Sequence, residues 1–371
     1  MDKLVITQKN QSVCLVHTIP GIANELVDFF SFYVPGYKFV PSYRNKMWDG
    51  KIRLFNAQSC ELPIGLFSYV QEFAKARGYV IEVEHDAYYG RPDSTNDIAF
   101  DDLIDFVKEL TLSSRGSQIA PREYQLEAMV EAVHRKRAIL LSPTGSGKSL
   151  IIYMLMRWML ANSTKKVLII VPTTSLVQQM YADFEDYSTY DESWDVENMC
   201  HRIYQGKPKM NMSQRVFIST WQSIYKLPGV WFEQFGTVFG DEVHNFKSKS
   251  LTGIMNKSRE AEYRFGTTGT LDGTKTHKLV LEGLFGRIYN VTTTKKLQDD
   301  NTLAPLDIKV LLLKYPEEVR KAWGKKEYHQ EIDYIVKCEA RNRLITNLSL
   351  DQNGNTLVLF QFVDKHGKVL Y

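Results

Sequence analysis

The sequence has few cysteines and no long apolar run. Its four cysteines lie far apart and form no Cys-x-x-Cys pair: Cys14, Cys60, Cys200 and Cys338. This spacing argues against a zinc site and is typical of a protein from a reducing compartment. The most apolar stretch, 150–160, is shorter than a membrane span and contains Arg157. Because the start also lacks the organisation of a signal peptide, the sequence predicts a soluble, cytoplasmic protein with no membrane partner.

There is also little excess of either charge. Lys and Arg total 46 and Asp and Glu total 43, which gives a formal net charge of +3. A net charge of this size does not by itself indicate a nucleic-acid partner. The hydrophobic content of 44% is typical of a globular chain. The length of 371 residues predicts about two to three domains.

A glycine-rich segment follows the apolar run 138–141. It reads Ser-Pro-Thr-Gly-Ser-Gly-Lys-Ser over 142–149. Such a segment wraps backbone N–H groups around phosphates: the glycines allow a close approach, the lysine reaches the β- and γ-phosphates, and the final hydroxyl binds Mg²⁺. The residues expected to hold the nucleotide are Ser142, Pro143, Thr144, Gly145, Ser146, Gly147, Lys148 and Ser149.

A second segment, Asp-Glu-Val-His at 241–244, follows another apolar run at 237–240. Both segments are therefore expected at the carboxyl ends of parallel strands, where ligands of α/β sheets bind. Asp241 is predicted to be a second ligand of the Mg²⁺, and Glu242 is predicted to polarise a water molecule. Together with the glycine-rich segment, these residues predict hydrolysis of a nucleoside triphosphate.

The two segments, in this order, resemble those of the superfamily-2 helicases and translocases, and in particular those of phage helicases that act on branched DNA. The resemblance covers the chain from about Gln118 onward, and the region 1–110 resembles the amino-terminal region of such phage helicases. It implies that ATP and Mg²⁺ are the cofactors and that Arg122 and Gln125 lie at the adenine. A glutamine amide suits that role because it donates and accepts hydrogen bonds at once. The alternative is that Gln125 only starts a helix.

The resemblance also assigns two segments to the nucleic acid. Segments 172–178 and 218–223 are similar to those that grip one strand in this family. They supply the candidate contacts Thr173, Ser175, Gln178, Thr220 and Gln222. The alternative for the first segment is helix capping alone, because Ser175 is well placed as an N-cap before Leu176. Helix N-termini also bind phosphates, so both interpretations stay open.

A further segment resembles the one that couples the ATP site to the strand. It supplies Thr267, Thr268 and Thr270, and the resemblance implies that His244 bridges to Thr268 and senses the γ-phosphate. Capping of the next helix is the alternative for the threonines, and a structural hydrogen bond is the alternative for His244. The catalytic residues expected from motif and resemblance together are Lys148, Asp241, Glu242 and His244.

The order of strand and helix patterns predicts an α/β fold. Alternation over 118–292 is typical of a doubly wound parallel sheet, which by the resemblance is a RecA-like motor domain. A small α+β domain is expected over 1–112, followed by a flexible linker over 113–117. The acidic stretch 183–197 is expected to be a solvated loop.

Residues 293–371 are expected to begin a second RecA-like motor domain. Strands are predicted at 307–314 and 356–362, on either side of one long polar helix over 317–350. The later motifs of the family, including its arginine finger, should lie beyond Tyr371. An arginine finger contributes about 10³–10⁵ in rate to related phosphoryl transfers, so this chain is expected to be a truncated motor with weak or no ATPase activity.

The amino-terminal domain offers a candidate DNA surface. Basic residues interleave with aromatic ones over 37–53, and such residues pair with phosphates and stack on exposed bases. The predicted DNA contacts are Arg44, Lys46 and Trp48. The alternative is a small domain whose aromatic residues form the core and whose charges form a solvated rim. We expect Phe39 and Phe55 to lie in that core.

The predicted function is that of an ATP-dependent DNA helicase or translocase that acts on branched or forked DNA in recombination, replication and repair. Its expected partner is branched, forked or single-stranded DNA, with an RNA–DNA hybrid as a further candidate. The protein is expected to act as a monomer, in the host-cell cytoplasm if it comes from a phage. Two alternatives stay open: a translocating subunit of a restriction or remodelling complex, and an ATP-switched module that binds or anneals nucleic acid. Glu242 argues against the second, because a switch needs no residue that polarises water.

Overall fold

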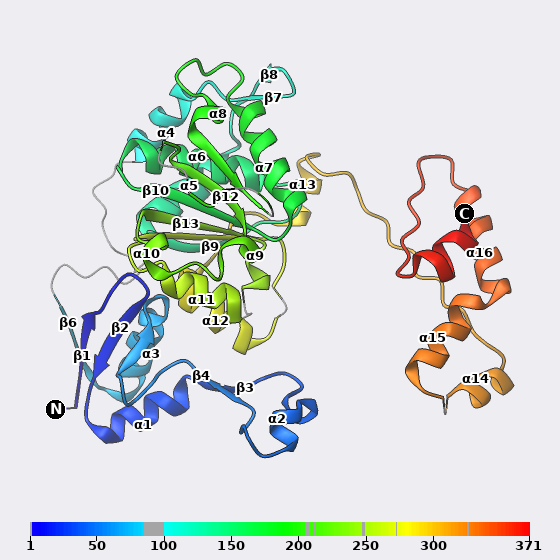
Figure 1. Cartoon of the computed structure of the whole chain (residues 1–371), viewed down its shortest axis with the longest axis horizontal. Helices are drawn as coiled ribbons and strands as arrows, with labels where there is room; N and C mark the ends of the chain where they lie inside the picture. The colour runs from blue at the N-terminus through cyan, green and yellow to red at the C-terminus, as the bar shows by residue number, and fades with distance from the viewer. Residues whose placement is uncertain are drawn as a thin grey trace. The chain divides into compact units, whose positions relative to one another are not determined.

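The computed structural model describes residues 2–84, 100–204, 206, 208–210, 213–246, 249–271, 273–324 and 326–371. The chain forms two compact units, of which the first ends at Ala304 and the second runs from Pro305 to Tyr371 (Figure 1). The first unit contains an amino-terminal subdomain and a motor domain. It extends past the expected boundary at 292 because Leu297 is completely buried in the motor core.

The amino-terminal subdomain is built on a four-stranded sheet with the order β5-β2-β1-β6. Its strands are β1 (Lys3–Gln8), β2 (Val13–His17), β5 (Glu61–Pro63) and β6 (Val80–Val83). Alternate side chains of β1 face one core, where Leu4 and Ile6 are completely buried. Helices α1 (Pro20–Phe29) and α3 (Phe67–Arg77) pack into the same core. This arrangement confirms the expected small α+β domain.

A short arm projects from this subdomain (Figure 1). It consists of two antiparallel strands with two short helices between them: β3 (Ser31–Tyr33), η1 (Tyr37–Phe39), α2 (Pro41–Arg44) and β4 (Lys51–Arg53). Phe55 is buried as expected, but Phe39 is 76% exposed. The prediction of a core position for Phe39 is wrong, because this residue lies on the arm and away from the packed sheet and helices.

The segment 113–117, expected as a flexible linker, is fixed to the motor domain. It forms a small hairpin from β7 (Ser113–Ser114) and β8 (Ser117–Gln118). The backbone N–H of Arg115 donates a hydrogen bond to the Asp186 carboxylate at 2.8 Å. The hairpin is thereby held against the helix that carries Asp186.

The motor domain contains a seven-stranded parallel sheet with the order β11-β12-β10-β13-β14-β9-β15. Its strands are β9 (Arg137–Leu141), β10 (Lys166–Val171), β11 (Cys200–Ile203), β12 (Val216–Thr220), β13 (Phe235–Asp241), β14 (Tyr263–Thr268) and β15 (Ile288–Asn290). Strand β10 is apolar from Val167 to Val171 because it is buried on both faces: Val167 and Ile169 join one core, and Leu168 and Ile170 join the other. The sheet confirms the predicted doubly wound α/β fold.

Helices cover both faces of this sheet (Figure 1). One core includes residues of α4 (Phe100–Glu109), α5 (Glu123–Arg135), α6 (Lys148–Ala161), α7 (Thr174–Tyr187), α8 (Val196–Met199) and α13 (Thr294–Asp299). The other includes residues of α9 (Trp221–Ile224), α10 (Gly229–Phe232), η3 (Val243–Asn245), α11 (Lys249–Lys257) and α12 (Lys275–Phe285). Helix α4 therefore packs with the motor domain, although its sequence was assigned to the amino-terminal domain.

The acidic stretch 183–197 is not the solvated loop that its composition predicts. Helix α7 continues to Tyr187, and Asp191 is only 7% exposed. The Asp191 carboxylate pairs with the Arg157 guanidinium at 2.7 Å. The guanidinium also lies 4.2 Å from the centre of the Trp194 ring. This carboxylate can be buried because its charge is paired and hydrogen-bonded.

The amino-terminal subdomain and the motor domain are joined by direct contacts along α12. Segment η2 (Ile64–Leu66) lies so close to that helix that a Cβ on Gly65 would be 2.0 Å from the Glu282 carbonyl oxygen. The Tyr69 hydroxyl donates a hydrogen bond to the buried Glu282 carboxylate at 2.6 Å. Backbone and side chain thus fix the subdomain to the motor domain.

The described part of the second unit is helical. It contains α14 (Glu317–Trp323), α15 (Tyr328–Lys337), α16 (Glu339–Leu350), the π-helical turn η4 (Val363–Gly367) and α17 (Lys368–Leu370). The prediction of one helix over 317–350 is wrong. A capping box at Glu327 starts a new helix, and Cys338 has extended backbone between the second helix and the third.

The two strands predicted in this unit do not form among its described residues. Segments 307–314 and 356–362 carry exposed apolar side chains, for example Ile308 at 74% and Leu357 at 82%. Both segments have strand-like composition. A strand also requires a hydrogen-bonded neighbour, which composition alone does not supply.

Candidate nucleotide site and nucleic-acid surface

The glycine-rich loop 142–149 connects the end of β9 to the start of α6. Gly145 and Gly147 have φ angles of +82° and +79°, in the left-handed region that favours glycine. A Cβ on Gly147 would lie 2.4 Å from Gln125 Nε2, and one on Gly145 would lie 2.6 Å from Leu303 Cδ2. The loop leads directly into the N-terminus of a long helix, which is the arrangement that binds phosphates.

Residues of α5 hold this loop from one side. Gln125 is 3% exposed, its Nε2 donates to the Ser146 carbonyl at 2.9 Å, and its Oε1 accepts from the Arg122 N–H at 2.9 Å. The Tyr124 hydroxyl donates to the same Ser146 carbonyl at 2.9 Å. The two residues predicted at the adenine therefore lie beside the phosphate loop, and their role toward adenine stays a prediction.

Asp241 and Glu242 stand at the end of β13. Asp241 is 8% exposed, and its Oδ1 accepts hydrogen bonds from Thr267 Oγ1 at 2.7 Å and from the Glu242 N–H at 3.0 Å. Burial raises the pKa of Asp241. Glu242 has a φ of +51°, a costly conformation that is concentrated at functional sites. Its Oε1 lies 3.6 Å from Lys148 Nζ, so this carboxylate and the ammonium group of the loop face the same space.

His244 forms the bridge that the resemblance implies. Its Nδ1 lies 3.1 Å from Thr268 Oγ1 and 3.3 Å from Glu242 Oε2. The Thr268 hydroxyl donates its proton to the Thr270 carbonyl at 2.9 Å, so His244 Nδ1 is the donor to Thr268. Thr270 therefore contributes its backbone to this network. Thr267, predicted to act in coupling, contacts the Asp241 carboxylate.

Ser149 and Asp241 provide the oxygen atoms expected for Mg²⁺. A hydroxyl and a carboxylate suit this ion, which usually takes one or two protein ligands together with substrate phosphates. Within the described residues, no group of three or more His, Cys, Asp or Glu side chains could hold a metal ion. The donor set thus fits Mg²⁺ bound together with a nucleotide, rather than a metal held by protein alone.

Ser149 has partners on α7 that the sequence analysis missed. Its Oγ lies 2.8 Å from the Tyr187 hydroxyl. Burial raises the pKa of Asp183, and the hydrogen bond from Ser149 to this carboxylate acts in the opposite direction. Burial also raises the pKa of Tyr187 to about 12. No local pattern near Tyr187 could have indicated this contact, whereas Tyr124 stands inside a matched segment and could have been found.

The two predicted strand-gripping segments lie at the same edge of the sheet. Strands β10 and β12 are neighbours, with Val171 paired to Thr220, so the segments that follow them emerge side by side. Thr173 is the N-cap of α7 and accepts from the Leu176 N–H at 3.3 Å. The interpretation of Ser175 as the N-cap is therefore wrong, because the helix begins earlier.

These candidate DNA contacts differ in how accessible they are. Thr173, Ser175 and Gln222 are exposed. Gln178 Oε1 accepts a hydrogen bond from Arg202 at 2.6 Å, and Thr220 is buried with its hydroxyl 2.9 Å from that of Ser223. The first three side chains are therefore accessible at the edge of the sheet, whereas the other two form hydrogen bonds within the protein.

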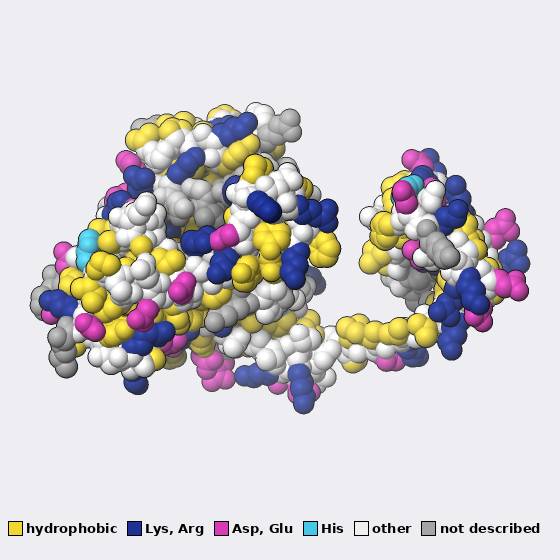
Figure 2. All heavy atoms as spheres, turned by 90° about the horizontal axis from the view of Figure 1, so that it is seen from below, with side chains coloured by type: hydrophobic (Ala, Val, Ile, Leu, Met, Phe, Trp, Pro, Cys, Tyr) yellow, Lys and Arg dark blue, Asp and Glu magenta, His cyan; other side chains and the backbone are white. Residues whose placement is uncertain are grey.

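The predicted contacts of the amino-terminal arm lie together. An open hollow is lined by Arg44, Lys46 and Trp48, together with Lys38, Tyr43, Met47 and the acidic Asp49. Arg44 and Lys46 are exposed, and Trp48 is half-buried with its Nε1 donating to the Lys51 carbonyl at 2.9 Å. Viewed from below, Lys and Arg side chains are scattered among hydrophobic and acidic ones on the surface (Figure 2). The distinguishing feature of the arm is its local mixture of basic side chains and aromatic rings.

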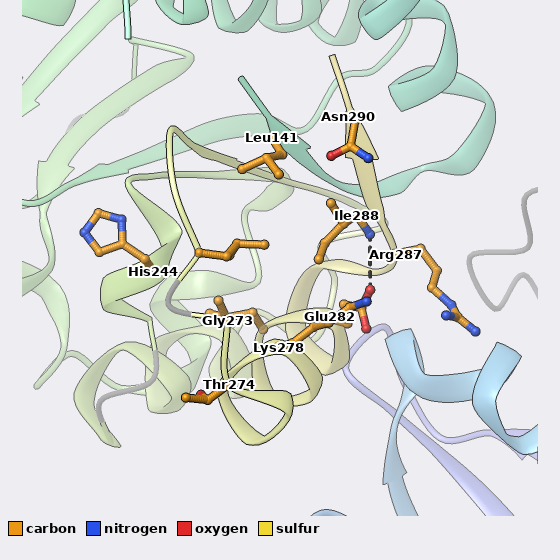
Figure 3. Close-up of a pocket in the computed structure, with 11 residues that line it drawn as sticks. Leu141, His244, Gly273, Thr274, Lys278, Glu282, Arg287, Ile288 and Asn290 are labelled. Atoms are coloured by element: carbon orange, nitrogen blue, oxygen red, sulfur yellow. Dashed lines mark hydrogen bonds between the residues drawn. The ribbon is translucent and has the colours of Figure 1, made fainter. Parts of the chain in front are cut away.

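A separate pocket of about 350 Å³ lies between α12 and the ends of β9 and β15. Figure 3 shows Glu282 inside it, hydrogen-bonded to the Ile288 N–H at 3.3 Å, with Arg287 pointing away toward the amino-terminal subdomain. His244 reaches its rim, but no residue of the loop 142–149 lines it. This pocket is therefore distinct from the nucleotide site built by the predicted residues.

Comparisons with known proteins agree with the geometry. A profile described as "Type III restriction enzyme, res subunit" matches residues 118–273, and one described as "DNA helicase UvsW, N-terminal" matches residues 5–84. The chain is 34% identical over 354 residues to the ATP-dependent DNA helicase uvsW of Enterobacteria phage T4, which covers 94% of this chain and 68% of that protein. It is 28% identical over 153 residues to the DNA 3'-5' translocase XPB2 of Sulfurisphaera tokodaii, which covers 41% of this chain and 31% of that one.

Solved structures give the same result. The crystal structure of the UvsW helicase from Bacteriophage T4 matches with a TM-score of 0.70 and 32% identity, over 78% of this chain and 99% of that one. A further crystal structure of T4 UvsW matches with a TM-score of 0.71 and 31% identity, over 99% of this chain and 72% of that one. Among the described residues, no helix is long and apolar enough to cross a membrane.

Proposed function

Because the chain belongs to the UvsW family of superfamily-2 DNA helicases, we propose that it is an ATP-dependent DNA helicase that acts on branched or forked DNA in recombination, replication and repair. One observation carries the ATPase part: Lys148, Glu242 and His244, from two separate segments, converge on one space at the sheet edge. The match of residues 5–84 to the UvsW amino-terminal profile supports the choice of branched DNA.

The chemistry follows from the positions of these side chains. Lys148 would hold the β- and γ-phosphates, and Ser149 and Asp241 would hold Mg²⁺, which when bound neutralises phosphate charge. Glu242 is proposed to accept a proton from the attacking water at its carboxylate. Catalysis of this kind depends mainly on positioning and on compensation of charge, and the bonds of Asp241 to Thr267 and to the Glu242 N–H supply such positioning. Arg122 and Gln125 are proposed to contact the adenine.

The proposed coupling runs through His244. Its ring contacts both the Glu242 carboxylate and the Thr268 hydroxyl, so a change at the γ-phosphate side would alter the segment after β14. Thr173, Ser175 and Gln222 are proposed to contact one DNA strand where β10 and β12 end. Gln178 and Thr220 are proposed to belong to the same surface. The two motor domains would then move the strand by closing and reopening.

The arm is proposed to contribute the preference for branched DNA. Arg44 and Lys46 would pair with phosphates, and Trp48 would stack on a base that is unpaired at a junction. A single-stranded partner or an RNA–DNA hybrid offers the same groups. We propose that the protein acts as a monomer in the cytoplasm. For a phage protein, this is the cytoplasm of the host cell.

The direct test is ATP turnover by a protein that carries this chain together with the family's later motifs, measured without DNA and with duplex, single-stranded and four-way-junction DNA at equal nucleotide concentration. We expect turnover to rise most with the junction, because only that DNA offers both strand and branch contacts. Equal turnover in all four reactions would refute the proposal, while stimulation by single strands alone would retain the translocase and remove the branch preference.

A translocating subunit of a restriction or remodelling complex is the second candidate. The profile matched over 118–273 supports it, since such a subunit shares the motor. It differs in requiring a partner subunit, so strand separation by the purified chain alone would exclude it. A switch module without turnover is disfavoured by the contact between Glu242 and Lys148, which a switch does not need.

A further inference from the structure

The hydroxyl of Ser149 is held by helix α7. Its Oγ lies 2.8 Å from the Tyr187 hydroxyl, and the two hydroxyls form a hydrogen bond. Ser149, at the start of α6, is thus tied through Tyr187 to a second helix.

A serine hydroxyl has one proton and two acceptor positions, and a tyrosine hydroxyl can donate or accept. In the bond between Ser149 and Tyr187 either hydroxyl can be the donor. In both cases Ser149 Oγ keeps at least one free acceptor position, and this lone pair is the one that a cation would use.

Tyr187 is itself held in place. Its ring lies 5.6 Å from the ring of Tyr153, centre to centre, and Tyr153 is also 5.3 Å from Phe184. Tyr153 and Phe184 are completely buried. Asp186, next to Tyr187, accepts a hydrogen bond from the Arg115 N–H at 2.8 Å. Packing thus sets the position of the Tyr187 hydroxyl.

We propose that Tyr187 is a positioning residue that orients the Ser149 hydroxyl toward Mg²⁺ in the nucleotide complex. This inference rests on the proposed ATPase function. Residues outside the coordination sphere that orient a ligand typically change metal affinity by about 10–100-fold when they are replaced. Because Tyr187 acts through Ser149, its replacement should change nucleotide binding in the presence of Mg²⁺ and not in its absence.

The test compares binding of a fluorescent ATP analogue with Mg²⁺ and with EDTA. The measured quantity is the dissociation constant in EDTA divided by the dissociation constant in Mg²⁺. This ratio isolates the contribution of the metal to binding. We expect Tyr187→Phe to lower this ratio by about 10-fold or more, with the constant in EDTA unchanged.

Tyr181→Phe is the matched control. Tyr181 also lies on α7 and is buried, and its ring contacts Arg202 at 3.9 Å. This substitution removes a hydroxyl from the same helix without touching Ser149 and should leave the ratio unchanged. In a Ser149→Ala background, Tyr187→Phe should add no further loss if it acts through Ser149.

Three outcomes would overturn the inference: an unchanged ratio in Tyr187→Phe, an equal loss of affinity in Mg²⁺ and in EDTA, or full additivity with Ser149→Ala. The second outcome would assign Tyr187 to the fold of the loop. Failure of the proposed function looks different, because then the unsubstituted protein itself would bind the ATP analogue no more tightly with Mg²⁺ than with EDTA.

Discussion

The phosphate site and the amino-terminal arm hold their functional side chains in opposite ways. In the phosphate site, buried residues from distant segments bond to one another, as Asp241 does to Thr267 and Gln125 does to the Ser146 carbonyl. In the arm, the bond of Trp48 Nε1 to the Lys51 carbonyl stays within the arm, and Arg44 and Lys46 are exposed.

This difference corresponds to two kinds of work. A site whose side chains are hydrogen-bonded to one another holds the reacting groups in position to within a fraction of an ångström. Catalysis requires this precision. Exposed basic residues act through charge and tolerate movement, which suits attraction of a phosphate backbone. Substitutions in the first region should therefore change rates, and substitutions in the second should change affinity and its dependence on salt.

The largest expected effect tests the first half of this comparison. Glu242→Gln keeps the size of the side chain but removes the base, so DNA-stimulated ATP turnover should fall by about 10²–10⁴. Nucleotide affinity should persist, because Lys148 and the loop are intact. Single-turnover hydrolysis and equilibrium nucleotide binding measure the two quantities.

Two further variants serve as comparisons for Glu242→Gln. Glu260→Gln removes a carboxylate that is 53% exposed and paired with Lys165, and it should leave turnover unchanged. Lys148→Ala should instead weaken nucleotide binding. Normal turnover in Glu242→Gln would remove Glu242 from the proposed chemistry.

The second prediction tests the arm. Replacing Arg44, Lys46 and Trp48 together should weaken binding to branched DNA and flatten its salt dependence. Each lost phosphate contact removes a slope of roughly 0.7–0.9 in log K against log salt, and a lost stack costs about 1–3 kcal/mol. A salt titration of junction binding measures both.

Stability separates the two readings of the arm. If these residues contact DNA, the thermal stability of the triple variant should change little, since exposed substitutions usually stay within about 0.5 kcal/mol. A lowered melting temperature with an unaltered salt slope would mean that the residues support the fold. The arm would then be held by contacts within the protein, as the phosphate site is.

A third, smaller effect is expected where the two regions are joined. Gly65→Ala places a methyl group 2.0 Å from the Glu282 carbonyl oxygen, so the subdomain must shift against α12. Overpacking of this kind costs about 1–3 kcal/mol, to be measured as the free energy of unfolding in denaturant. Gly21→Ala is the control, because a Cβ there meets no atom within 4 Å. Equal stability of the two variants would show that the joint is loose.

The smallest effect concerns coupling between the regions of the motor. Thr268→Val removes the hydroxyl that binds His244 Nδ1 and the Thr270 carbonyl, and a hydrogen bond of this kind contributes about 0.5–1.5 kcal/mol. Strand separation should fall by up to about tenfold while ATP hydrolysis is retained. Thr270→Ala keeps the carbonyl and should behave as the unsubstituted protein. An equal loss of both activities in Thr268→Val would assign the residue to folding or ATP binding.

Local signals were sufficient for much of the motor domain. A glycine-rich loop after an apolar strand indicates a helix that begins at its lysine, and α6 (Lys148–Ala161) begins there. In the amino-terminal subdomain, Gly78 has a φ of +71° and directly follows α3, as glycine commonly does at the end of a helix. These features depend on neighbouring residues, and the sequence displays neighbours directly. The convergence of Lys148 with Glu242 follows from the rule that parallel strands present their carboxyl ends at one edge.

Contacts between distant segments were decided only by the tertiary structure. Three such contacts join residues that are far apart in the sequence, and no local pattern links their positions. They are Ser149 with Tyr187, Thr267 with Asp241, and Leu303 with Gly145. The sequence by itself determined the chemistry that this chain carries, because motif residues are local. Which residues orient that chemistry was decided by packing, because orientation depends on elements that meet only when the chain is folded.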